Sequence, residues 1–371
     1  MLAVAFCVAV TAFIGALVGH AIWQTASSNN GLQSTGNSST PTFHYASPGG
    51  SSPSSGSNGS TSSVAAKVDP GLVDINTVLS YEDLEGAGTG MVLTSNGIVL
   101  TNNHVVEGAT SISVTDIGNG RTYSATVLGY DRTQDVALIQ LVGASGLSTV
   151  DLSTSAATVG EKVVAIGNAG GTGGSPSTAA GTVTATDQSI TASDEANGSS
   201  EQLTGLIESD ADIVQGDSGG PLVNESGDVL GMDTAAAQGF EFQSSGNQGY
   251  SIPISTATAI AKKIEAGTTS SVIHIGTTAF LGVTVESAQS AGTGSSGAAI
   301  AQVFPGTPAS SANLQQGDTI TSVSGVTITS PESLTNVILS KKPGDTVSVV
   351  YTNTNGSQQT TNVQLGSGPP Q

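Results

Sequence analysis

Short apolar runs separated by Gly, Asn and Asp follow one another along the chain from about residue 67 onward. Runs of this length that are rich in β-branched residues and bounded by turn residues predict β-strands. In the larger part of this region we expect strands at 89–93, 98–101, 111–114, 123–130, 136–141, 163–167, 178–186, 206–209, 221–223, 229–233 and 250–253. About a dozen short strands at this spacing predict two antiparallel barrels or a sandwich. A helix over 256–265, capped by Ser255, is expected to close the module.

A second, smaller β-rich unit is expected from about Ala279 onward. Its predicted elements are strands at 280–283, 299–304, 319–323 and 346–351 and a helix at 331–340. A unit of about 90 residues is long enough to fold by itself. The Gly/Thr/Ser-rich stretch 266–278 predicts a hinge, so we expect one domain over 67–265 and a second over 279–366.

The first 66 residues have a different pattern. Residues 1–23 contain no Asp, Glu, Lys or Arg and are mostly apolar, and a helix of this length can cross a hydrocarbon core of about 30 Å. We interpret the segment as a transmembrane anchor, with a cleaved signal peptide as the alternative, because the basic n-region of a signal peptide is missing. Residues 24–66 are uncharged, and 32 of these 43 positions are Ser, Thr, Gly, Asn or Pro. This composition predicts a disordered tether.

Charge and composition exclude several classes of function. The chain has 28 Asp and Glu against 8 Lys and Arg, a net charge of -20, so it lacks the basic surface that displaces counterions from nucleic acid. Its single cysteine, Cys7, excludes an intrachain disulfide and a cysteine-based zinc site. We expect neither a metal nor a cofactor. The 49 glycines and the few aromatic residues favour many turns and a mainly β fold.

The segment 216–222, Gly-Asp-Ser-Gly-Gly-Pro-Leu, carries the strongest chemical signal. A tight turn around Ser218 can expose its hydroxyl and aim the backbone N–H groups of Gly216 and Ser218 at one point, as an oxyanion hole requires. Serine is a weak nucleophile unless a base takes its proton. The candidate base is His104, just after a predicted strand, and Asp135 at the mouth of an apolar strand could orient the imidazole.

Each of these three features has a structural alternative. The turn could be an ordinary hairpin, a histidine after a strand is usually structural, and Asp is a common turn residue before a strand. Their occurrence together, in the order His, Asp, Ser, is not expected by coincidence. The other histidines, His20, His44 and His274, lie in the predicted membrane segment, tether and hinge. His104 is therefore the candidate base.

At these residues the chain resembles the HtrA (DegP-like) trypsin-like serine proteases. Residues 101–106 (Thr-Asn-Asn-His-Val-Val), 135–138 (Asp-Val-Ala-Leu) and 216–222 resemble three signature blocks of that family, and 86–90 and 249–253 match two more. The resemblance implies a chymotrypsin-like double β-barrel, a His-Asp-Ser triad and a family of envelope quality-control proteases that are commonly trimeric.

The smaller unit resembles a PDZ domain, an α+β fold. Phe280, Leu281, Gly282 and Val283 resemble its carboxylate-binding loop, and 303–309 with 314–320 resemble its next segment. The resemblance implies that a peptide C-terminus adds a strand and places its carboxylate on the N–H groups of this loop. The alternative is that 280–283 is simply a buried strand.

Two acidic positions depart from the family's pattern. Asp217 stands before the nucleophile, where the family usually has Asn, and no activation sequence supplies an N-terminal amine, so we expect a hydrogen bond within the oxyanion loop. Asp212 lies six residues before Ser218, where the family usually has Ala. Together with Tyr250 and Ser251 it is a candidate for the specificity pocket, where a carboxylate would favour Lys or Arg at P1. A surface carboxylate in a shifted loop is the alternative, and we favour it.

The leading hypothesis is a membrane-tethered, extracytoplasmic serine endopeptidase that hydrolyses unfolded or damaged proteins. It would be single-pass in the cell membrane, or secreted after signal cleavage, and a homotrimer is the assembly that the resemblance implies. The rival hypothesis is a PDZ-based binding or chaperone protein whose protease-like domain is held inactive. Active-site labelling separates the two.

Overall fold

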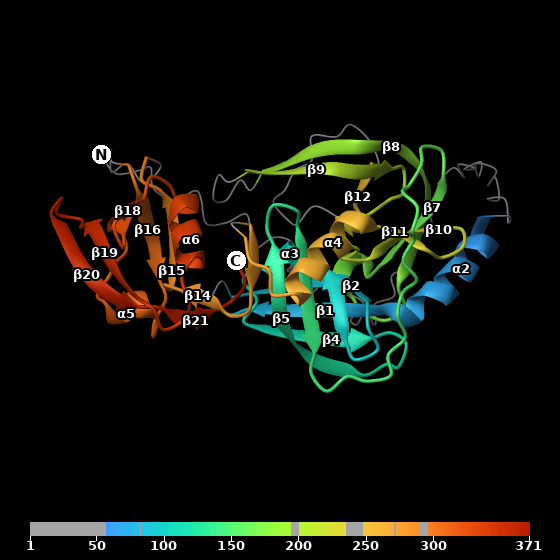
Figure 1. The fold of residues 1–371 in the computed structure, drawn as a ribbon, viewed down its shortest axis with the longest axis horizontal. Coiled ribbons are helices and arrows are strands. Elements are labelled where there is room, and N and C mark those ends of the chain that lie inside the picture. Colours follow the sequence, from blue (N-terminus) through green and yellow to red (C-terminus); the bar gives the residue numbers. More distant parts are fainter. Residues whose placement is uncertain (1–56, 82, 194–199, 235–247, 271, 290–295) are drawn as a thin grey trace, which may run out of the picture. The chain divides into compact units, whose positions relative to one another are not determined.

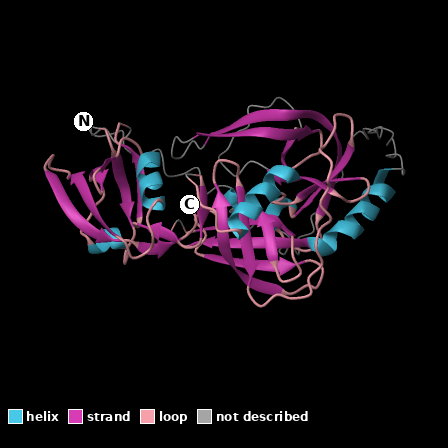
Figure 2. Ribbon diagram, in the orientation of Figure 1, coloured by secondary structure: helices cyan, strands magenta, loops and turns pink. Residues whose placement is uncertain are grey.

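The computed structural model describes residues 57–81, 83–193, 200–234, 248–270, 272–289 and 296–371. Within these ranges the strands form two closed barrels and a separate C-terminal sheet, with few helices (Figures 1 and 2). The strand pattern in the sequence was compatible with two barrels or with a sandwich, and the structure contains two barrels. The predicted anchor at 1–23 lies outside these ranges. No helix within them is long and apolar enough to span a membrane.

The first barrel has six strands in the order β5-β4-β1-β2-β3-β6, and β6 also pairs with β5, which closes it. Its short helix α3 (Asn103–Val106) follows β3, and β13 (Ile273–Ile275) adds to β5 from outside. The strands are β1 Leu72–Leu79, β2 Leu84–Val92, β3 Ile98–Thr101, β4 Ser111–Asp116, β5 Thr122–Asp131 and β6 Val136–Leu141.

The second barrel closes in the order β10-β11-β12-β9-β8-β7. Helix α4 (Ile254–Glu265) buries one face in a core that both barrels share, which includes Leu100, Leu138, Met232 and Ile264. A 3-10 turn η3 (Ala169–Gly171) follows β7. The strands are β7 Lys162–Gly167, β8 Ser177–Ser193, β9 Ser200–Ser209, β10 Pro221–Asn224, β11 Val229–Thr234 and β12 Gly249–Pro253.

The C-terminal unit has its own apolar core and a sheet in the order β15-β16-β17-β19-β20. Helix α6 (Pro331–Leu339) begins with a capping box: Ser330 Oγ accepts from Ser333 N–H at 3.2 Å, and Ser333 Oγ accepts from Ser330 N–H at 3.0 Å. The other elements are β14 Thr278–Phe280, β15 Val283–Ser287, β16 Ala298–Val303, α5 Pro308–Ser311, β17 Thr319–Val323, β18 Val326–Thr327, β19 Thr346–Thr352, β20 Gln358–Gln364 and β21 Gly366–Gly368.

Three predicted features of the protease-like part are wrong in detail. Residues 57–68, assigned largely to the disordered tether, form helix α2 (Ser57–Val68), which leads through η2 (Asp69–Gly71) into a strand, β1, that the sequence did not reveal. Val64 and Val68 of α2 are buried in the shared core, which offsets the poor helix propensity of the segment. Helix α4 starts at Ile254, so Ser255 lies inside it rather than capping it.

Two predictions around the C-terminal unit also need correction. The expected strand at 280–283 is divided, because β14 ends at Phe280 and β15 begins at Val283. The expected hinge at 266–278 contains β13, whose buried Ile273 packs on the shared core. Because Ile273 is buried, this segment is more restricted in its movement than a free hinge.

Candidate active site

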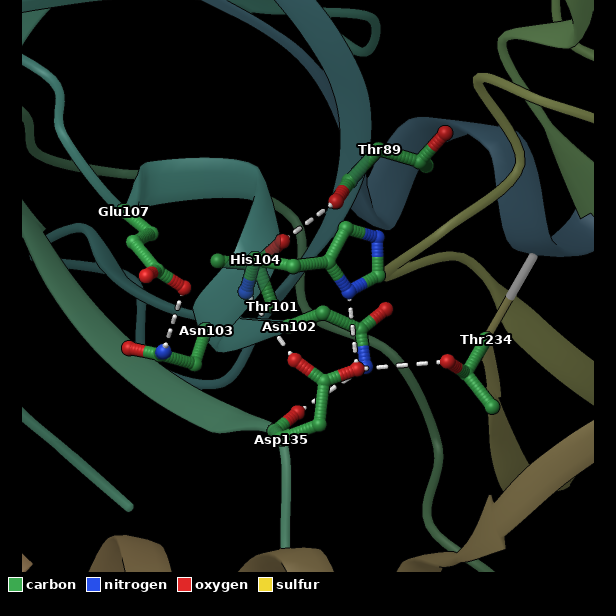
Figure 3. A network of polar contacts seen from close by, with 8 residues as sticks. All are labelled: Thr89, Thr101, Asn102, Asn103, His104, Glu107, Asp135 and Thr234. Atoms are coloured by element: carbon green, nitrogen blue, oxygen red, sulfur yellow. Dashed lines mark hydrogen bonds and ion pairs between the residues drawn. The ribbon is translucent and has the colours of Figure 1, made fainter. Parts of the chain in front are cut away.

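His104 and Asp135 lie together on the first barrel, as the sequence predicts (Figure 3). His104 is carried by α3, and Asp135 occupies the turn between β5 and β6. The Asp135 carboxylate contacts His104 twice: Oδ2 lies 2.8 Å from the ring Nδ1, and Oδ1 accepts from the backbone N–H at 3.0 Å. Thr234 of β11 donates its hydroxyl to the same Oδ2 at 3.2 Å. These contacts fix the carboxylate against the imidazole.

The backbone at Asp135 is itself held in an unusual conformation. Its φ is 51°, in the left-handed region, which Asp tolerates better than most residues. The Asn102 side-chain amide donates to the Asp135 carbonyl at 3.0 Å and ties this turn to the residue that precedes α3. Helix α3 with His104 and the turn with Asp135 are therefore fixed to each other through backbone as well as side chains.

Ser218 lies on the second barrel, in residues 214–220, which we call the nucleophile loop. Each carbonyl from Gln215 to Ser218 accepts a hydrogen bond, three of them from outside the loop and that of Asp217 from within it. The donors are Gly170 N–H to Gln215 O at 2.7 Å, Thr89 Oγ1 to Gly216 O at 2.8 Å, Gly220 N–H to Asp217 O at 2.9 Å and Thr89 N–H to Ser218 O at 2.8 Å.

These carbonyl contacts set the direction of the amide groups. In a trans peptide the N–H points away from the C=O of the same plane. Holding Gln215 O against Gly170 therefore turns the Gly216 N–H to the opposite side, and holding Asp217 O against Gly220 N–H does the same for Ser218 N–H. The loop has the ordered peptide planes that an oxyanion hole requires.

At two positions the loop has a left-handed backbone that demands glycine. Gly216 and Gly219 have φ of 97° and 83°, where L side chains are strained. A Cβ at Gly216 would collide with the Asn168 carbonyl, and a Cβ at Gly219 would collide with the Thr89 carbonyl and the Thr101 hydroxyl. The Gly-rich motif is therefore required by close packing against the first barrel and against the segment after β7.

The acidic residues around the loop have different surroundings. Asp212 is exposed, as expected for a surface carboxylate. Asp217 accepts from Val214 N–H at 3.0 Å within the loop, as the sequence analysis anticipated, and from Ser177 Oγ at 3.4 Å. Burial raises the pKa of Asp217, and the nearby charge of Asp212 raises it further. Tyr250 is buried on β12, next to Ser251.

Asp233 is a buried acid that the sequence analysis missed. It is fully buried on β11, where Ser251 Oγ donates to its Oδ1 at 2.7 Å and Oδ2 has no hydrogen-bond partner among the described residues. Desolvation by burial raises the pKa of Asp233 well above its ordinary value. The burial of Asp233 was difficult to predict from the sequence, since an Asp at the end of an apolar strand usually begins a turn.

Burial raises the pKa of six aspartates, so the protein is expected to be more stable in mild acid than at neutral pH. A carboxyl whose folded pKa lies above its unfolded value stabilises the fold fully below the unfolded pKa, here 3.8, and that stabilisation is lost as pH rises through the folded pKa. The six are Asp69, Asp74, Asp116, Asp217, Asp233 and Asp318.

Calorimetry on the inactive Ser218→Ala variant between pH 4.5 and 8 checks this expectation. The melting temperature of the barrel domain should fall by several degrees over that interval, because about 1 kcal/mol shifts Tm by roughly 2–4 °C in a domain of about 150–250 residues. Asp233→Asn keeps the shape and removes the ionisable group, so it should flatten the pH profile. A melting temperature that rises steadily toward pH 8 would contradict the assignment.

The candidate carboxylate loop of the C-terminal unit is ordered in the same manner. Leu281 O accepts from Ala309 N–H at 2.9 Å, and Gly282 O accepts from Phe304 N–H at 3.1 Å. The N–H groups of Gly282 and Val283 therefore point to the other side. Strand β15, which follows, lies at the edge of its sheet, so it can accept an added strand.

The structure shows contacts of Thr89, Asn102 and Thr234 that sequence reasoning did not assign to the site. All three are buried polar residues in or beside strands. For two of them the place in the sequence is a signal, since Thr89 lies in the 86–90 block and Asn102 in the 101–106 block; Thr234 lies in none of the blocks. Among the described residues, no group of His, Cys, Asp and Glu is arranged to hold a metal ion.

Comparison with known proteins covers both folded parts. Residues 88–232 match the trypsin-like peptidase domain family, and residues 279–365 match the PDZ domain family. The chain is 33% identical over 325 residues to the serine protease PepD of Mycobacterium tuberculosis, covering 83% of this chain and 66% of PepD. It is also 33% identical over 274 residues to the periplasmic pH-dependent serine endoprotease DegQ of Escherichia coli, covering 72% of this chain and 56% of DegQ.

Among solved structures, the HtrA-type protease AlgW with a tripeptide matches 84% of this chain and 98% of its own, at 26% identity and a TM-score of 0.47. The chain spans between about half and two thirds of the length of the two curated relatives. The two family matches cover both domains, and the two curated relatives extend beyond the aligned region.

Proposed function

Because the chain belongs to the HtrA (DegP-like) family of serine proteases, we propose that it is an extracytoplasmic serine endopeptidase acting on unfolded or damaged proteins. The observation that carries the proposal is the 2.8 Å contact between His104 Nδ1 and Asp135 Oδ2. The ordered carbonyls of the nucleophile loop support it.

In the proposed reaction, Ser218 Oγ attacks the carbonyl carbon of the scissile peptide bond and His104 Nε2 takes the hydroxyl proton. Asp135 holds the proton on Nδ1 and stabilises the imidazolium that forms. The N–H groups of Gly216 and Ser218 donate to the oxyanion of the tetrahedral intermediate. His104 then protonates the leaving amine, and a water molecule repeats the sequence to release the acyl group from Ser218.

The C-terminal unit binds peptide C-termini in this proposal. The terminal carboxylate meets the N–H groups of the Phe280–Val283 loop, and the peptide backbone pairs with the edge strand β15. This arrangement is supported by the order of the loop carbonyls and by the open edge of the sheet. A captured C-terminus raises the local concentration of an unfolded chain near Ser218.

The proposal also places the protein at a membrane. Residues 1–23 contain no Asp, Glu, Lys or Arg and are mostly apolar, which suits a single-pass anchor that leaves the catalytic and PDZ domains outside the cytoplasm. A homotrimer is the proposed assembly. Retention of the chain in alkaline-washed membranes and a trimer mass by light scattering in detergent are the expected results. Release by the wash or a monomer mass would count against these two points.

One disulfide-containing protein, offered in native form and in reduced, alkylated form, tests the function. The full chain is expected to digest the unfolded form at least about tenfold faster, because an extended segment must enter the site. A peptide with a free C-terminal carboxylate should alter this rate, whereas the same peptide as a C-terminal amide should not. Equal rates of digestion for the two forms, or no digestion of either form, would contradict the proposed substrate class.

A further inference from the structure

Thr89 of β2 makes four hydrogen bonds at the junction of the two barrels, and none of the catalytic roles above includes it. Its N–H donates to Ser218 O at 2.8 Å, and its hydroxyl donates to Gly216 O at 2.8 Å. The same hydroxyl accepts from Asn168 N–H at 2.9 Å, and its carbonyl accepts from the Thr101 hydroxyl at 2.7 Å. With 1% of its surface exposed, Thr89 has no water to replace a lost partner.

These partners belong to three separate segments of the chain. Gly216 and Ser218 lie in the nucleophile loop, Asn168 follows β7 in the second barrel, and Thr101 ends β3 in the first barrel. Thr101 stands three residues before His104, and Figure 3 shows its hydroxyl directed at Thr89 beside the imidazole. A chain of hydrogen bonds thus runs from the strand that leads to the base, through Thr89, to the loop that carries the nucleophile.

The effect on the loop follows from its peptide planes. Gly216 O is held by Thr89, while the N–H of the same plane, that of Asp217, donates to Val214 O at 3.0 Å. Ser218 O is held by Thr89, while Gly219 N–H donates to Asp233 O at 2.9 Å. Both planes are thus fixed at each end. They flank the plane that carries Ser218 N–H, so that amide keeps its direction only while its neighbours keep theirs.

We propose that Thr89, itself held by Thr101, is a positioning residue that holds the nucleophile loop in its reactive conformation through its hydrogen bonds to Gly216 O and Ser218 O. The inference rests on the proposed protease function. Thr89 does not touch the reacting atoms: it acts through the orientation of the Gly216 and Ser218 peptide groups. Its hydroxyl is a side-chain donor to Gly216 O, whereas the contacts given above for the carbonyls of Gln215, Asp217 and Ser218 come from backbone N–H groups.

Substitution of Thr89 by Val and by Ser tests the inference. Thr89→Val keeps the side-chain shape and removes the hydroxyl, which leaves Gly216 O and Asn168 N–H without their partner. We expect kcat on a peptide substrate to fall about 10- to 100-fold, with KM changed by less than about twofold. Thr89→Ser retains the hydroxyl, so its kcat should stay within about threefold of that of the parent.

The matched control is Thr77→Val on the neighbouring strand β1. Thr77 is also buried, and its hydroxyl has no hydrogen-bond partner among the described residues, so the same atomic change should leave kcat unaltered. A folded Thr89→Val protein with the parent's kcat, a loss confined to KM, or an equal loss in Thr77→Val would each overturn the inference.

A second variant covers the case in which Thr89→Val does not fold. Thr101→Val removes only the donor to Thr89 O, and we expect a smaller loss in kcat, about 3- to 10-fold, with KM again unchanged. An unchanged kcat in that variant would then overturn the inference. A parent protein that cleaves no substrate would instead refute the proposed function, so the two failures are distinguishable.

Discussion

Replacement of Ser218 by Ala is expected to lower kcat for peptide cleavage by about a millionfold, the scale observed when a triad nucleophile is removed from a serine protease. The loss should fall on kcat, because Ala keeps the glycine-rich backbone of the loop and leaves substrate contacts intact. Initial rates of cleavage of a fluorogenic peptide by the purified full chain provide the measurement.

Ser209→Ala is the matched control for that substitution. Ser209 is fully buried on β9, and its hydroxyl has no hydrogen-bond partner in the part of the chain that the structure describes. Removing this hydroxyl should change neither kcat nor KM. Residual activity of Ser218→Ala at even a hundredth of the parent's would show that another group performs the chemistry.

Replacement of Asp135 by Asn is expected to lower kcat by about 10⁴, the scale known for loss of this carboxylate in serine proteases. Asp135 uses both carboxylate oxygens: Oδ1 accepts from the His104 backbone N–H, and Oδ2 contacts His104 Nδ1 and the Thr234 hydroxyl. The Asn side chain has only one oxygen. If the amide nitrogen faces Nδ1, the imidazole must carry its proton on Nε2. In that tautomer it cannot accept the proton of Ser218.

Asp116→Asn serves as the control for the charge change. Asp116 is equally buried, lies on β4 and accepts a hydrogen bond from Asn119 N–H at 2.8 Å, away from the candidate site. Its replacement should leave kcat within about twofold of the parent. A drop of similar size in both variants would mean that buried charge, rather than the orientation of His104, matters to activity.

The sequence was sufficient to predict most strands because alternation and turn residues mark them locally. Strands β3, β6 and β17 have the predicted bounds. Strand β1 was missed even though Val73 and Ile75 are fully buried, because Asp74 and Asn76, which alternate with them, are residue types depleted in strands. Asp74 is accommodated by a tertiary contact, Gly174 N–H to its carboxylate at 3.1 Å, which no local pattern announces.

The candidate site shows the same division between local and tertiary information. His104, Asp135 and Ser218 were predicted because each lies in a distinctive short motif. Thr89, Thr234 and Asp233 were not, because their contacts depend on the tertiary fold. Thr89 and Gly216 are 127 residues apart, Thr234 and Asp135 are 99 residues apart, and the contact of Asp233 with Ser251 depends on strand pairing. Helix α2 likewise forms where composition favours disorder, since Val64 and Val68 are buried in the shared core.

Reaction of the full chain with a fluorescent fluorophosphonate tests the central claim most directly, because the probe reports an activated serine next to an ordered oxyanion hole. It should be applied with and without an unfolded protein such as casein, to the parent and to Ser218→Ala. We expect labelling of the parent alone, with modification at Ser218. An unlabelled parent under both conditions, or a labelled Ser218→Ala protein, would contradict it and favour a PDZ-based binding protein or a different nucleophile.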